Sequence, residues 1–187
     1  MLAELDVVVF VKSPDDLDRT AERIFGALKS EYQADSSEDW GGNYYQASGL
    51  GFNAALFSHT GDMLDPEFED YQYGLEITSE FWCVELDESI LAGQLSEYYA
   101  RLLAFDLNVE TATEVLLETT EEAEIFEIRA FRRNPQYRLD QAPTTPKVFL
   151  IETRQVEEPF DEDDWEEEEY GEAEENEETE EVAREEP

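Results

Sequence analysis

The sequence has few of the residues that build covalent or metal-bound sites. Cys83 is the only cysteine and His59 the only histidine among 187 residues. A single cysteine excludes an intramolecular disulfide and fits a reducing compartment, and one residue of each kind cannot supply the three or four nitrogen and sulfur ligands of a zinc site. Cys83 lies in an apolar run with no nucleophile pattern around it. We therefore interpret both residues as structural.

Motifs for nucleotide binding and membrane insertion are also missing. The sequence contains neither a P-loop nor a Gly-x-Gly-x-x-Gly fingerprint. No apolar run approaches the roughly 20 residues that cross a bilayer, and the N-terminal MLAELDVVVFVKS lacks the positive start of a signal peptide. We expect a cytoplasmic protein that is not an enzyme, with no catalytic residue, cofactor, bound metal or membrane association.

Positive charge is scarce: 12 Lys and Arg stand against 50 Asp and Glu, for a net charge of -38. Residues 1–150 hold 30 of the acidic and 10 of the basic residues, so the acidity is not confined to the C-terminal part. This charge repels phosphate backbones and anionic lipids, and we expect no direct contact with nucleic acid. It favours a basic protein partner. In an alternative interpretation, the acidity is an adaptation to a high-salt interior and carries no functional information.

Two helices are predicted from apolar spacing and capping residues. After an apolar strand at 5–11, Ser13 is suited to cap a helix that has Pro14 in its first turn. The buried stripe of this helix is expected to contain Leu17, Ala21, Ile24 and Leu28. A second helix is expected to start after Asp87 or Ser89 and to end near Asn108. Its predicted buried stripe consists of Leu91, Leu95, Tyr98, Leu102 and Phe105.

The remaining apolar segments predict strands. Residues 44–47 and 51–58 indicate a hairpin, 73–78 and 81–86 one kinked strand or two, and 114–118 with 124–131 a second hairpin, although a helix is an alternative for 124–131. Residues 147–152 indicate an edge strand, whereas 35–43 and 60–71 are expected to be loops. The prediction is an α+β fold of two layers, a mainly antiparallel sheet with both helices on one face.

The C-terminal segment has a different composition from the rest. Residues 151–187 contain 20 Asp and Glu and 2 Arg. Such a segment cannot bury enough apolar surface to offset the entropy of ordering it. We therefore expect one domain over residues 1–155 and a disordered, glutamate-rich tail over residues 156–187.

Aromatic residues alternate with acidic ones in several places, which is typical of a surface that binds a basic protein. The candidate partner-binding residues are Trp40, Asp62, Asp65, Glu67, Phe68, Glu69, Asp70, Tyr71 and Trp165. Two other interpretations remain open. Some of the aromatics would instead be core residues. The carboxylates of residues 62–70 would serve a carboxylate-based enzyme, with or without Mg²⁺ or Ca²⁺, although their spacing matches no EF-hand.

The sequence contains one cluster of basic residues, which consists of Arg129, Arg132, Arg133 and Arg138. It would neutralise nearby carboxylates, bind an anionic group or hold the chain's own acidic tail.

One succession of segments resembles a known class of proteins. It consists of LDVVVFVKS, a capped helix, GLGFNAALF, an acidic loop, YGLEIT and a helix containing YARLL, all within residues 5–118. This order resembles small acidic bacterial domains of the toxin-immunity type. The resemblance implies a non-enzymatic, single-domain inhibitor that neutralises a basic toxin, often a nuclease.

Overall fold

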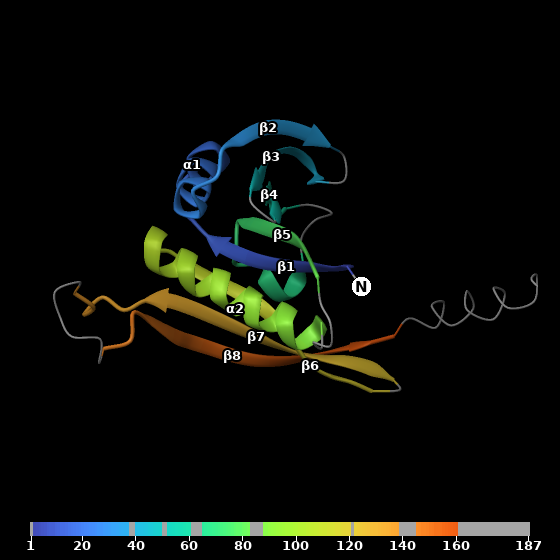
Figure 1. The fold of residues 1–187 in the computed structure, drawn as a ribbon. Helices are drawn as coiled ribbons and strands as arrows, with labels where there is room; N and C mark the ends of the chain where they lie inside the picture. The colour runs from blue at the N-terminus through green and yellow to red at the C-terminus, as the bar shows by residue number, and fades with distance from the viewer. Residues whose placement is uncertain are drawn as a thin grey trace, which may run out of the picture.

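The molecule is built around one sheet, in which most neighbouring strands also follow one another in the sequence (Figure 1). The computed structural model describes residues 2–37, 40–49, 52–60, 65–82, 88–120, 122–138 and 145–160. In these ranges the strands are β1 (Leu2–Lys12), β2 (Tyr32–Ser37), β3 (Gly42–Gly49), β4 (Phe52–Ser58), β5 (Tyr73–Trp82), β6 (Glu110–Thr119), β7 (Ala123–Arg133) and β8 (Val148–Pro159). The helices are α1 (Leu17–Leu28), α2 (Glu88–Leu107) and the short 3₁₀ helix η3 (Pro66–Phe68).

The sheet order is β2-β3-β4-β5-β1-β6-β7-β8, and each neighbouring pair in the described chain is antiparallel. Two meanders, β2 to β5 and β6 to β8, are joined through β1 in the middle. The prediction of an α+β fold with a mainly antiparallel sheet is confirmed.

Both helices lie on one face of the sheet, as predicted. Alternate residues of β1, Val7, Val9 and Val11, are at most 3% exposed and belong to the same core cluster as Ile24 of α1 and Leu103 of α2. Alternation along a strand sends the intervening residues to the opposite face. There Phe10 belongs to a second, smaller cluster of buried residues. The other members of this second cluster are Phe68, Tyr71, Ala112, Ile128 and Ala130.

The predicted hairpins are present and are longer than expected. β3 pairs with β4 from Tyr44↔Phe57 to Gly49↔Phe52, and β6 pairs with β7 over most of their length. The helical alternative for residues 124–131 is therefore wrong. Residues 73–82 form one strand, β5. The edge strand β8 continues to Pro159, past the predicted domain boundary at residue 155.

The start of α1 corrects one prediction. The N-cap is Asp16, whose carboxylate accepts a hydrogen bond of 2.9 Å from the backbone N–H of Arg19, and not Ser13. The Ser13 hydroxyl instead accepts from the Asp15 N–H at 3.3 Å and from the Thr20 hydroxyl at 3.1 Å. Ser13 and Asp16 are both of the residue types that cap helices, and they lie within one turn of each other. Because the Ser13 hydroxyl contacts Asp15 and Thr20, Asp16 caps the helix.

Two further predictions were wrong. Residues 35–37 belong to strand β2, which has no apolar alternation and is held by its pairing with β3. In α2 the residue Tyr98 is 58% exposed, whereas Ser96, Ala100, Leu103, Ala104 and Leu107 are buried. Helix α2 packs closely against β6, where small side chains are needed: a Cβ added at Gly93 would meet Cγ1 of Val115 at 2.9 Å. A stripe chosen by hydrophobic size misses such positions.

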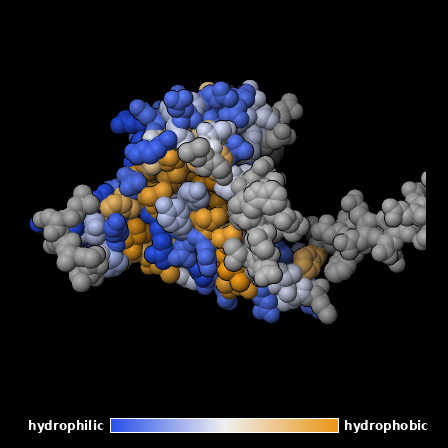
Figure 2. Space-filling view, viewed as in Figure 1, coloured by the Kyte–Doolittle hydropathy of each residue, from blue (hydrophilic) through white to orange (hydrophobic). Residues whose placement is uncertain are grey.

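The surface seen beside α2 reflects this arrangement. In Figure 2 hydrophobic patches lie on both sides of a hydrophilic strip in the middle of the view, whereas hydrophilic side chains cover the part that contains β2. The predicted cap residue Asp87, the cysteine Cys83 and the acidic segment 161–187 lie outside the described residues.

Candidate functional site

The sheet is divided where β1 leaves β6. β1 pairs with β5 along almost its whole length, from Leu2↔Trp82 to Val11↔Tyr73. Its pairing with β6 covers only the segment from Val9↔Thr113 to Lys12↔Glu110. On the N-terminal side of Val9, β1 pairs with β5 and no longer with β6. On the C-terminal side of Thr113, β6 pairs with β7 and no longer with β1. The two halves of the sheet therefore separate at this point.

A cleft of about 420 Å³ lies at this divergence, and we call it the β1–β6 cleft. Residues of β1, β6 and β7 provide most of its wall, the segment before η3 adds Asp65, and α2 adds Ala92 and Gly93. The described lining residues are Asp6, Val8, Phe10, Asp65, Ala92, Gly93, Glu114, Leu116 and Phe126. Three of them are carboxylates, five are apolar and none is basic, so the cleft combines apolar walls with negative charge.

Glu114 is the most perturbed carboxylate of the cleft. Burial raises its pKa to about 7, and the negative charges of Glu158, Asp65 and Glu67 add to the effect. Its Oε1 atom is buried and accepts no hydrogen bond from the described residues. A buried carboxylate oxygen without a donor is costly while it is charged. The cleft therefore holds a group that either takes up a proton near neutral pH or is stabilised by a cation.

A second acidic position lies beside the cleft on β5. Burial and the charge of Asp6 raise the pKa of Glu76. Asp6 pairs with Thr78, and both Glu76 and Thr78 line a smaller hollow of about 210 Å³ over β3 to β5. Trp40 and Tyr44 line the same hollow, and the rings of Trp40 and Phe57 are 4.7 Å apart. Of the predicted binding residues, Trp40 thus lines this hollow and not the cleft.

His59 and η3 hold Asp65 at the cleft. The N–H of Asp65 donates to Nε2 of His59 at 2.8 Å, and Nδ1 of His59 is 3.0 Å from the carbonyl oxygen of Tyr71. His59 is 2% exposed, so its two ring nitrogens are used inside the fold. The Asp65 carboxylate then caps η3 by accepting from the N–H of Glu67 at 2.8 Å. These contacts agree with the structural interpretation of His59.

The predicted loop residues have different environments. Phe68 is 1% exposed and stacks on Phe10 with ring centroids 3.7 Å apart, and Tyr71 is 8% exposed. Both residues belong to the second core cluster. This agrees with the alternative interpretation, in which some of the aromatic residues are core residues. Glu69 and Asp70 are exposed, and Oδ2 of Asp70 is 3.8 Å from Nζ of Lys12. Asp62 and Trp165 lie outside the described residues.

Glu67 stands beside the last strand of the sheet. Its Oε2 atom is 2.6 Å from Nη1 of Arg154, and Nη2 of Arg154 donates to its carbonyl oxygen at 2.7 Å. Arg154 is therefore already paired with Glu67. Asp65 and Glu67 are the two predicted residues that the fold brings to Glu114.

Sequence reasoning missed Asp6, Glu76 and Glu114. Each is a carboxylate in the middle of a strand, within LDVVV, GLEIT and TATEVLL, and such positions are unusual in a sheet. This signal is visible in the sequence. Their proximity was not, because it depends on the register of β5, β1 and β6 and on the point where β1 and β6 separate.

The predicted arginine cluster is used largely within the fold. Arg129 contacts Glu97 at 2.6 Å and Glu127 at 2.5 Å, and Arg132 pairs with Glu110. The hydrogen bonds from Arg129 and Arg101 lower the pKa of Glu97 despite the opposing effect of its burial. For Arg129 and Arg132 the interpretation as neutralisers of nearby carboxylates is confirmed.

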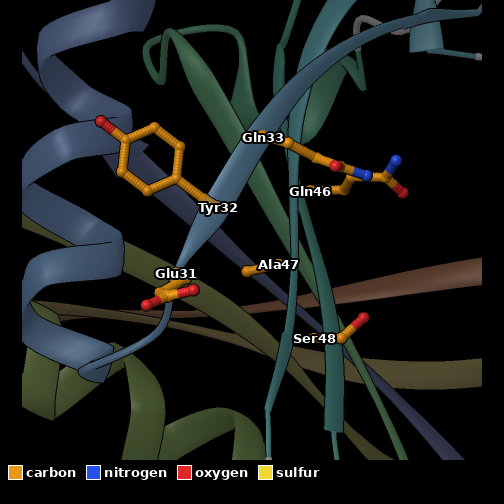
Figure 3. A pocket seen from close by; sticks show the side chains of 6 residues that line it. All are labelled: Glu31, Tyr32, Gln33, Gln46, Ala47 and Ser48. Atoms are coloured by element: carbon orange, nitrogen blue, oxygen red, sulfur yellow. The ribbon is translucent and has the colours of Figure 1, made fainter.

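A third hollow, of about 310 Å³ along β2 and β3, is not a convergent site. In Figure 3 Tyr32 lies toward α1, whereas Gln33 and Gln46 point to the other side of the strands. The Tyr32 ring stacks on Phe25 of α1 at 5.1 Å. The side chains around this hollow therefore do not face a common ligand.

Within the described ranges, no three His, Cys, Asp or Glu residues are placed so that they could hold a metal ion. No described helix is long and apolar enough to cross a membrane. Comparison with protein-family models, curated proteins and solved structures finds no match for this chain.

Proposed function

We propose that this protein is a non-enzymatic binding protein that engages a basic protein partner through the β1–β6 cleft, in the manner of a toxin-immunity protein. The observation that carries the proposal is the carboxylate of Glu114. It has a buried oxygen without a donor among the described residues, and the surrounding charges are negative. A lysine or arginine side chain of a partner would supply both the missing donor and the missing positive charge.

The walls of the cleft fit the rest of such a side chain. Val8, Leu116 and Phe126 would contact the aliphatic stem of a lysine or arginine, which packs on apolar surface while its charged end reaches a carboxylate. Asp6 of β1 and Asp65, which precedes η3, would contact the same cation. The net charge of -38 would in addition attract a basic protein from a distance.

Binding of a cation would be coupled to release of a proton. Because the pKa of Glu114 in the free protein is about 7, part of the population is protonated at neutral pH. A bound lysine or arginine favours the ionised form and lowers that pKa. Affinity should therefore rise as the pH increases through about 7.

Affinity capture from the native host at low salt tests the proposal. Wild-type protein should retain one or more basic proteins, and Glu114→Gln should lose them, because it removes the charge and keeps the shape. Glu22→Gln, which removes one exposed charge on α1, away from the cleft, is the matched control and should retain them. Failure to capture any basic protein, or equal capture by both variants, would contradict the proposal.

A carboxylate-based enzyme is the second candidate, because a carboxyl group with a pKa near 7 in a cleft is suited to general acid–base catalysis. A version that uses Mg²⁺ or Ca²⁺ predicts a higher melting temperature in millimolar metal. An unchanged melting temperature would exclude that version.

A further inference from the structure

The two edges of the sheet differ in length and chemistry. β2 has six residues, Tyr32–Ser37, whereas β8 has twelve. β2 exposes polar side chains apart from Tyr32 and Ala34. β8 exposes three consecutive large apolar residues, Phe149, Leu150 and Ile151, at 42%, 48% and 42%. Sheet edges of natural proteins are usually short or protected by charge, so a long edge with exposed apolar residues is unusual.

One side of β8 has backbone groups available for pairing. Among the described residues β8 pairs only with β7. The register slips once, between Ala130 and Phe131, which leaves Ile151 without a partner residue on β7. From Glu152 to Pro159 the register is regular. On its outer side, alternate residues of this segment present N–H and C=O groups, except that Pro159 has no N–H.

The charge of the regular segment is negative. Glu152, Glu157 and Glu158 are exposed, and Arg154 is the only cation between residues 152 and 159. Arg154 is engaged by Glu67, so its charge is locally neutralised. A basic strand would complement this edge. A second copy of this chain would bring the same glutamates, and its net charge of -38 opposes self-association.

We propose that β8 is a docking edge for an extended, basic segment of a partner protein, which adds to the sheet as a further strand. Its backbone would pair with Glu152–Pro159, its lysine or arginine side chains would meet the three glutamates, and an apolar residue would cover Phe149 and Ile151. Main-chain hydrogen bonds supply affinity in this mode, and side chains supply specificity. The proposal concerns a different surface from the β1–β6 cleft and does not depend on it.

Figure 1 shows β8 along the lower side of the sheet next to β7, and the strand order places β7 between β8 and β6. β8 nevertheless influences the cleft through one packing contact and one charge. Val156 pairs with Phe126, which lines the cleft, and Glu158 contributes to the raised pKa of Glu114. A partner strand on β8 would therefore be separated from β6, the strand that carries Glu114, by two strands, β8 and β7.

The test uses the full chain and a fluorescent peptide of alternating lysine and valine as the probe. A second peptide of the same sequence is N-methylated at successive residues, so that neither of its edges can pair. Both peptides carry the same charge, and attraction to the acidic C-terminal segment affects them equally. We expect the methylated peptide to bind at least about tenfold more weakly, because each lost backbone hydrogen bond contributes to affinity.

Two protein variants locate the binding. Ile151→Lys should weaken binding of the unmodified peptide by about tenfold, because it replaces an exposed apolar contact by a like charge. Gln33→Lys adds the same charge on the other edge and should have little effect. Hydrogen exchange should show protection within residues 149–159 and no new protection in β2.

Equal affinities of the two peptides would overturn the proposal, because binding would then be electrostatic only. Protection absent from β8 would also overturn it. So would a dimer in analytical ultracentrifugation whose formation protects β8, because the occupant would then be a second copy. The Glu114→Gln variant should bind the probe normally, which separates this proposal from that for the cleft.

Discussion

His59 and Asp65 are joined by a hydrogen bond of 2.8 Å, in which the backbone N–H of Asp65 donates to Nε2 of His59. An accepting Nε2 carries no proton, so the proton of the neutral ring is on Nδ1, which donates to the carbonyl oxygen of Tyr71. One buried ring therefore joins the two ends of the segment 65–71. This segment places Asp65 and Glu67 beside the cleft and Phe68 in the second core cluster.

Replacing this ring should destabilise the fold. We expect His59→Ala to lower the free energy of unfolding by about 2 to 4 kcal/mol, because it leaves two buried backbone groups unpaired and a cavity. Urea unfolding measures the change. Gln33→Ala, at an exposed position, is the control and should change stability by less than about 0.5 kcal/mol. An equally small effect of His59→Ala would show that the ring does not hold the segment.

The stacked pair of Phe68 and Phe10 should be the main apolar attachment of the same segment. Phe68 is 1% exposed, and its ring lies 3.7 Å from that of Phe10 at an angle of 12°. We expect Phe68→Ala to cost about 3 to 5 kcal/mol and Phe68→Leu clearly less, since leucine refills part of the cavity. In the Phe68→Ala variant, hydrogen exchange should be faster at the amides of residues 65–71 than at those of β1. Similar costs for both variants would contradict this account.

The parts of the fold that were predicted correctly depend on short-range patterns. The apolar run of β1 and the apolar spacing of α1, whose predicted residues Ala21 and Ile24 are buried, each need only neighbours in the sequence. Strand β2 was missed because its residues Tyr32–Ser37 have little preference of their own and are held by pairing with β3. The stripe of α2 was misread because close packing selects small residues there.

The candidate site needed information of a different kind. Asp65 and Glu67 were selected from the composition of their loop, and both lie at the cleft or close to it. Asp6 and Glu114 are more than a hundred residues apart in the sequence, and their proximity depends on strand order. No local pattern encodes the point where β1 and β6 separate. The cleft was therefore beyond what sequence alone could predict.

Gly93 tests how closely α2 packs on the sheet. In an exposed helix Gly→Ala stabilises by about 1 kcal/mol. Here the new Cβ would meet Cγ1 of Val115 at 2.9 Å, so we expect Gly93→Ala to destabilise the protein by about 1 to 3 kcal/mol. Val115→Ala should relieve the clash, so that adding Gly93→Ala to it becomes neutral or favourable. A double-mutant cycle by urea unfolding measures this coupling, and additive effects would contradict it.

The pH dependence of stability tests the environment of Glu114. Its pKa rises from an ordinary value of 4.5 to about 7 in the folded protein, mainly through burial. The folded state thus binds more protons than the unfolded state between these two values. Stability contributed by this group is complete below the lower pKa and is lost as the pH rises through the higher one.

Glu114→Gln should therefore be more stable than wild type at pH 8, by about 1 to 2 kcal/mol once screening of the partly exposed side chain is allowed for. The difference should shrink as the pH falls toward 5. Urea unfolding across this range measures it, and Glu69→Gln shows how much of the gain comes from lower net charge alone. A difference that does not change with pH, or one equal to that of Glu69→Gln, would mean that the cleft does not destabilise the Glu114 carboxylate. The reason for expecting a bound cation there would then be lost.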